Sequence, residues 1–140
     1  MSGRKGYTLI EILVVLVIIG TLAALAWPNY MAIKEKSLNR EAQANLALIR
    51  AAEKIYRMEQ GFYYPSPAAA ISTISDINSF LKLSLPESAS VNWTITVDST
   101  VVPEFAEAER VGTGADGRVW SIEFPGDVDP SCTGGTNCPP

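Results

Sequence analysis

Residues 6–11 read GYTLIE, and the sixteen residues after them, ILVVLVIIGTLAALAW, contain no charged side chain. Pro28 closes this apolar run, and the chain then changes to the mixed composition of an ordinary soluble domain. A helix over residues 7–27 would be about 30 Å long, which matches the hydrocarbon core of a bilayer. The stretch therefore predicts one membrane-spanning helix.

The charges in front of the apolar run predict its orientation. Arg4 and Lys5 precede it, and basic residues next to a membrane span remain on the cytoplasmic side. We therefore expect the N-terminus in the cytoplasm and the remainder of the chain outside it.

Glu11 separates this segment from two ordinary alternatives. A signal peptide also has a basic start and an apolar core, and Ala24-Leu25-Ala26 fits its small-residue cleavage site. A plain single-pass anchor is the second alternative. Glu11 argues against both, because an ionisable side chain in an apolar segment is costly without a partner and usually marks function.

The short basic leader, GYTLIE and the long apolar run together resemble the class III signal of type IV prepilins and pseudopilins. In that family a membrane peptidase cuts after the glycine and then methylates the new N-terminal amine. By this resemblance Gly6 is the cleavage-site residue, Tyr7 becomes the methylated N-terminus, and Glu11 is the family's acidic residue. The family usually has Phe at the position of Tyr7, and the aromatic ring is retained here.

Pro28 matches a helix-breaking proline that the family commonly has after the apolar run. Proline lacks a backbone donor and clashes with the preceding turn, so a helix kinks or ends there. A helix that ends at Pro28 is one interpretation, and a helix that continues with a bend is favoured by the helical pattern that follows.

Glu11 also suggests how subunits would be aligned. In a bilayer we expect its carboxylate to be unpaired, whereas in a filament it would neutralise the Tyr7 amine of a neighbouring subunit. Leaving one member of a buried pair alone costs roughly 3–5 kcal/mol, and such pairs can set register. The hypothesis is that Glu11 enforces the axial stagger between subunits.

Residues 29–60 have the three- and four-residue spacing of an amphipathic helix. One apolar strip contains Leu38, Ala42, Leu46, Ile49, Ala52 and Tyr56. A second strip contains Ala44, Ala47, Leu48, Ala51, Ile55 and Met58. We expect one face to pack on a sheet and the other on neighbouring helices. Glu53 and Arg57 have the spacing of an ion pair, and Gly61 is expected to end the helix.

The remaining residues predict a small head with antiparallel strands. Residues 91–97 and 120–124 alternate apolar and polar side chains, 105–111 is a weaker strand candidate, and Asp116-Gly117 predicts a hairpin turn. Residues 71–83 predict a short helix. We predict an α+β pilin-like fold with three or four strands. Its expected parts are a leader (1–6), an apolar helix (7–28), an amphipathic helix (29–60) and a globular head (61–140).

The chain has no histidine and two cysteines, Cys132 and Cys138. Histidine-dependent triads and zinc sites are therefore excluded, and a disulfide in an oxidising compartment is predicted. Asp127 and Asp129 are too few ligands for calcium, so a solvated turn is the preferred interpretation. We predict no cofactor and no metal. No nucleotide loop or nucleophile–base set is present, and the chain is not expected to be an enzyme.

Residues 61–140 contain ten acidic and three basic residues, whereas 29–60 contain six basic and four acidic ones. The acidic head would repel phosphate, so we expect it to bind no nucleic acid.

The resemblance implies a pilin that polymerises with copies of itself into a type IV pilus or a pilus-like filament. Its expected partners are a prepilin peptidase and methyltransferase, an inner-membrane assembly platform and, before assembly, the membrane itself. The subunit is expected in the inner membrane with its head outside, and later in an extracellular filament or periplasmic pseudopilus. A type II secretion pseudopilin remains an alternative, as does a secreted or anchored binding module.

Overall fold

The computed structural model describes residues 6–87 and 92–139. Its helices are α1 (Leu9–Gln60) and α2 (Ile74–Leu81). Its strands are β1 (Ala70–Ile71), β2 (Trp93–Asp98), β3 (Phe105–Arg110), β4 (Val119–Glu123) and β5 (Ser131–Thr133). The chain divides into two compact units, residues 1–36 and 37–140. The basic flank Arg4–Lys5 and the first strand residue predicted, Val91, lie outside the described residues.

The first unit contains the N-terminal part of α1. This helix begins at Leu9 and continues through Pro28, so the interpretation of a continuing helix is confirmed. The apolar side chains between Leu9 and Trp27 are exposed in the isolated chain. By length and composition, this part of the helix is able to cross a membrane.

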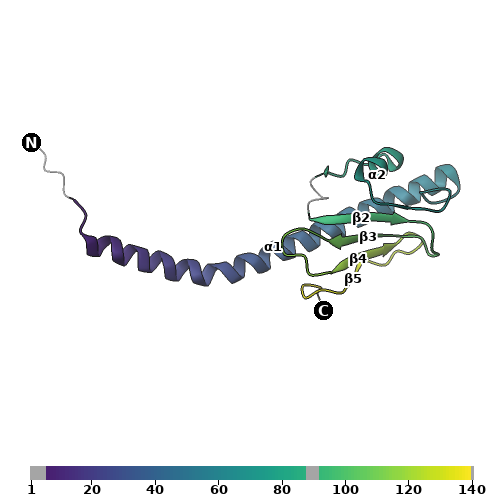
Figure 1. Ribbon diagram of the computed structural model, residues 1–140. Coiled ribbons are helices and arrows are strands. Elements are labelled where there is room, and N and C mark those ends of the chain that lie inside the picture. The colour runs from purple at the N-terminus through teal and green to yellow at the C-terminus, as the bar shows by residue number, and fades with distance from the viewer. Residues whose placement is uncertain (1–5, 88–91, 140) are drawn as a thin grey trace, which may run out of the picture. The chain divides into compact units, whose positions relative to one another are not determined.

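The second unit contains a five-stranded antiparallel sheet in the order β1-β2-β3-β4-β5, so each strand pairs with its neighbours in sequence (Figure 1). In the central pair, Ile95 lies opposite Ala108, and Ala108 lies opposite Trp120 on β4. This meander places alternate side chains of all three long strands on one common face.

That inner face packs on the C-terminal part of α1. The core residues from the sheet are Trp93, Ile95, Val97, Ala106, Ala108, Trp120 and Ile122, and those from the helix are Leu38, Ala42, Leu46, Ile49 and Ala52. These helical residues belong to the first predicted strip, so the prediction that one face of the helix packs on the sheet is confirmed, and the structure identifies that face. The predicted α+β architecture of a long helix on a small antiparallel sheet is also confirmed.

The strand prediction was incomplete. The structure has five strands because β1 and β5, of two and three residues, pair with the two sides of the predicted sheet. Asp116-Gly117 does lie between β3 and β4, but in a loop that extends from residue 111 to 118 rather than in a two-residue turn. The short helix predicted within 71–83 is α2, and α1 ends before Gly61, whose φ is +90°.

Candidate processing and assembly sites

The predicted cleavage residue Gly6 and its neighbour Tyr7 precede α1 and are exposed. A Cβ atom built on Gly6 would meet no other atom within 4 Å, and its φ is not in the left-handed region. The described residues therefore show no packing or backbone reason for a glycine at position 6.

Thr8 and Glu11 together cap the N-terminus of α1. The Thr8 backbone N–H donates to Glu11 Oε2 at 2.7 Å, and the Thr8 hydroxyl donates to the same oxygen at 2.8 Å. The Glu11 N–H donates in return to the Thr8 hydroxyl oxygen at 3.3 Å. This reciprocal arrangement is a capping box, in which donors of the first helical turn are satisfied locally.

Thr8 therefore hydrogen-bonds the Glu11 carboxylate within the same chain, but it supplies no opposite charge to neutralise it. The T-x-x-E spacing of Thr8 and Glu11 is the sequence signal that predicts this contact. A carboxylate at the first turn is also stabilised by the helix dipole. Any interaction of Glu11 with a second subunit would compete with, or add to, these local hydrogen bonds.

Gly6, Tyr7 and Glu11 lie within one short segment, whereas Pro28 lies about 25 Å further along the helix by the rise per residue. Cys132 and Cys138 belong to the second unit. The predicted residues are thus not gathered into one site. They mark a processing segment, an apolar helix surface and a C-terminal loop.

The predicted disulfide is present, with 5.6 Å between the Cα atoms of Cys132 and Cys138. The loop that it closes is held on the β3–β4 connection by Asp116. Its Oδ2 accepts hydrogen bonds from the Asn137 side chain at 2.9 Å and from the backbone N–H groups of Thr136 and Asn137, both at 3.1 Å.

The pKa of Asp116 reflects these contacts. Burial raises the pKa, but the hydrogen bonds from Asn137 and the Arg118 guanidinium, 3.1 Å away, outweigh it and hold the pKa well below its ordinary value. The same loop reaches α1, because Asn39 donates to the Asn137 carbonyl at 2.9 Å and accepts from the Trp120 indole at 3.3 Å. The sequence indicates Asp116 only as part of a turn and does not indicate Asn39, because the bonds of both to Asn137 join residues distant in the chain.

An apolar groove lies between the second strip of α1 and α2. Its volume is about 310 Å³, and its lining includes Leu48, Ala51, Ile55 and Phe80. Leu48, Ile55 and Phe80 are each roughly half exposed. The second strip, which does not belong to the core, is thus partly open within the second unit.

The described residues form no group of three or more side chains suited to hold a metal ion. Asp127 instead forms an ion pair with Lys54, which lowers the pKa of its carboxyl. Asp129 is exposed and belongs to a different surface, the outer face of the sheet.

Residues 1–27 match the family described as the Prokaryotic N-terminal methylation motif. The match covers the leader, the predicted cleavage site and the apolar run. This finding places residues 1–27 in the class of segment that the family describes, a prokaryotic N-terminal methylation motif.

Over part of its length the chain is similar to type II secretion system proteins and to a type IV pilin. It is 38% identical over 63 residues to "Type II secretion system core protein G" of Klebsiella pneumoniae, which is 45% of each chain. It is 41% identical over 60 residues to "Type IV major pilin protein PilA" of Myxococcus xanthus, covering 43% of this chain and 27% of that protein. The protein G of Escherichia coli K12 is 35% identical over 71 residues, or 51% and 48% of the two chains.

These similarities confirm the resemblance to type IV pilins and pseudopilins that was stated from the N-terminal residues. In each case the similarity spans less than half of the relative's own length. No solved structure matches the chain.

Proposed function

We propose that this protein is a non-enzymatic subunit of a type IV pilus or pilus-like filament. A prepilin peptidase would cut after Gly6 and methylate Tyr7. The apolar helix would anchor the subunit in the inner membrane with its head outside. An assembly platform in that membrane would then transfer it into a polymer of identical subunits.

The observation that carries this proposal is the exposed apolar surface of α1 behind a matched processing motif. Among the described residues, the large apolar side chains from Leu9 to Trp27 are exposed, so they require lipid or other subunits to remove them from water. A membrane would supply the lipid before assembly, and a bundle of helices in the filament would supply the neighbouring subunits.

The groove at Leu48, Ala51, Ile55 and Phe80 supports the same proposal. It is an apolar surface of the second unit, where small side chains such as Ala51 allow two helices to approach closely. An apolar helix of another copy has the chemistry to fill it.

The first test is the intact mass and N-terminal sequence of the mature protein from its native host. We expect a chain that begins at Tyr7 and is about 14 Da heavier from one methyl group. A chain that begins at Trp27 would mean ordinary signal-peptide cleavage. That result would remove the apolar helix, exclude the filament subunit and favour a secreted binding module.

Two substitutions at Glu11 separate its capping role from a charge role in assembly. Glu11→Gln retains an acceptor for Thr8 at the third helical position but carries no charge, whereas Glu11→Ala loses both. We expect both variants to be processed and both to lose filaments, as measured by electron microscopy and by the sheared surface fraction. Normal filaments from Glu11→Gln would mean that Glu11 acts as a cap and does not neutralise a neighbour's amine.

A subunit of a secretion pseudopilus is the second candidate, because several relatives are proteins of type II secretion systems. Immunogold labelling of intact cells separates the two. Labelled surface filaments support a pilus, whereas label found only after the envelope is opened supports a pseudopilus.

A further inference from the structure

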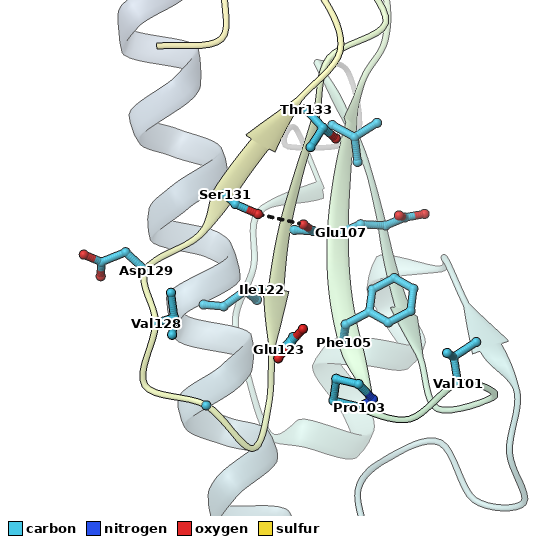
Figure 2. Close-up of a pocket in the computed structure, with 13 residues that line it drawn as sticks. Val101, Pro103, Phe105, Glu107, Ile122, Glu123, Val128, Asp129, Ser131 and Thr133 are labelled. Carbon is cyan, nitrogen blue, oxygen red and sulfur yellow. Dashed lines mark hydrogen bonds between the residues drawn. The ribbon is translucent and has the colours of Figure 1, made fainter. Parts of the chain in front are cut away.

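A second groove lies on the outer face of the sheet, the face opposite the one that packs on α1 (Figure 2). Its floor is formed by outward-facing residues of β3 and β4, including Phe105, Glu107 and Val119. The β2–β3 loop supplies Val101 and Pro103 at one side, and the β4–β5 loop supplies Val128 and Asp129 at the other. Its volume is about 550 Å³, which is within the range of ligand-binding clefts.

The groove combines apolar walls with negative charge. Glu107, Glu123 and Asp129 line it, and none of the described lining residues is basic. In the strand register, Phe105 lies opposite Asp98 on β2 and opposite Glu123 on β4. A half-buried aromatic ring is therefore flanked on both sides by carboxylates, an arrangement that attracts a cation to the ring.

The carboxyl of Glu107 lies in this groove near other acidic residues. Burial, followed by the charges of Glu109 and Asp98, raises the pKa of its carboxyl. A bound cation would relieve both the repulsion between these acids and the cost of burying one of them.

The head's own basic residues are engaged elsewhere. Lys82 forms an ion pair with Glu59, and Arg118 with Asp116. The rim of the groove is also held in place, because Arg50 donates to the Val128 carbonyl at 2.5 Å and Lys54 pairs with Asp127. No basic residue among those that line the groove neutralises its negative charge. Its β4–β5 rim is held to α1 by the contacts of Arg50 and Lys54.

We propose that this groove binds a peptide segment of another protein that carries lysine or arginine side chains beside apolar ones. The apolar side chains would cover Val101, Pro103 and Val128, and the cations would reach Glu107, Glu123 and the Phe105 ring. Phosphate-containing polymers are repelled by the same charges. In a filament with α1 in its core, the outer face of the sheet is the face directed away from that core.

The direct test uses the full-length chain in neutral detergent and a fluorescently labelled peptide, acetyl-Lys-Val-Lys-Val-Lys-amide. Fluorescence anisotropy is measured against a micelle-only blank. We expect saturable binding that weakens as salt is raised, and no binding of the charge-reversed peptide acetyl-Glu-Val-Glu-Val-Glu-amide. Equal binding of the two peptides would overturn the proposal.

Variants localise the binding to the groove. Glu107→Gln with Glu123→Gln is expected to weaken binding about tenfold. Asp76→Asn removes an exposed charge on α2 and is expected to change binding by less than about twofold. Val128→Lys places a cation on an exposed rim residue and is expected to block binding without disturbing the core.

Two results would contradict this assignment. Unchanged affinity in the Glu107/Glu123 variant and in Val128→Lys would place the peptide elsewhere. Absence of peptide binding, together with reduced self-association of the same variants, would make a second copy the occupant through its exposed Lys34, Lys36 and Arg40. The test does not depend on Tyr7 processing, so it can fail or succeed independently of the proposed filament.

Discussion

Glu53 is a carboxyl group buried within the head, with an exposed fraction of 0%. One oxygen accepts a hydrogen bond from the Tyr64 backbone N–H at 2.9 Å, and the other has no partner among the described residues. Burial, which outweighs the Tyr64 hydrogen bond, and the nearby charge of Glu104 raise the pKa of Glu53 to about 7. The predicted ion pair with Arg57 is not formed, because Arg57 lies over the Tyr63 ring and donates to its hydroxyl.

Because the pKa of Glu53 is raised, we expect the free energy of unfolding to depend on pH. The folded state holds the Glu53 proton more tightly than the unfolded state, whose pKa is near the ordinary value of 4.5. The stabilisation is therefore complete below about pH 4.5 and is lost as pH rises through about 7. We expect the free energy of unfolding to fall by about 3 kcal/mol over that window. Denaturant unfolding followed by circular dichroism measures it.

Glu53→Gln is the matched variant, because its amide oxygen still accepts from the Tyr64 N–H but does not ionise. We expect its free energy of unfolding to be nearly independent of pH between 4.5 and 7. A pH slope equal to that of the unsubstituted chain would assign the titration to a different group.

At the scale of single elements, the end of α2 is strained. Lys82 follows the helix with φ of +53°, a left-handed conformation that costs non-glycine residues roughly 1–2 kcal/mol. Glycine removes that cost, while the exposed ion pair with Glu59 contributes little. We expect Lys82→Gly to raise the free energy of unfolding by about 0.5–1 kcal/mol, as measured by denaturant unfolding.

Lys82→Ala is the control for the lost ion pair, because it removes the amine and keeps the unfavourable backbone conformation. We expect it to be no more stable than the unsubstituted chain. Equal stabilisation by alanine and glycine would show that the Lys82 side chain, rather than its backbone, is the source of the strain.

The C-terminal loop depends on the disulfide and on Asp116 together. Replacing both Cys132 and Cys138 by serine is expected to cost about 2 kcal/mol by loop-closure entropy. The loop would retain its hydrogen bonds to Asp116, so we expect β5 to loosen rather than the head to unfold. Limited proteolysis with mass spectrometry measures the new cleavage sites.

Asp116→Asn tests how much the charge of Asp116 contributes to holding the C-terminal loop. The amide keeps an acceptor for Thr136 and Asn137 but loses the charge that binds Arg118. We expect increased cleavage around residues 131–139 even with the disulfide intact. A loop that is fully protected in both variants would mean that neither contact holds it.

At the scale of the whole molecule, the apolar surface is divided into a packed part and an open part. Ile55 belongs to the open part, with an exposed fraction of 54%, and lines the groove beside α2. We expect Ile55→Glu to change the free energy of unfolding by less than about 0.5 kcal/mol, because the side chain is outside the core. Filament yield is expected to fall at least tenfold, since a charge would be buried between subunits.

Ser72→Glu adds the same charge at an exposed residue outside this groove and serves as the control. It is expected to leave filament yield unchanged, as measured from the sheared surface fraction. Normal yield from Ile55→Glu would show that the groove is not an interface between subunits.

The sequence alone determined the features that produce local, periodic patterns of apolar side chains or short motifs. The apolar run, the amphipathic spacing of residues 29–60 and the stop at Gly61 define α1. The alternation of apolar side chains defines β2 and β4, and GYTLIE belongs to the stretch that matches an N-terminal methylation motif. Each of these signals arises from the backbone geometry of one element, so no distant contact is needed to recognise it.

Only the tertiary structure decided which side chains are brought together from distant parts of the chain. The edge strands β1 and β5 are too short to show a period and exist through pairing with β2 and β4. Arg110 and Arg118 count as head charges in the sequence, yet both are buried beside the Trp93 ring. The burial of Glu53 and the acidic groove on the outer face also result from packing, which depends on neighbours that lie far apart in sequence.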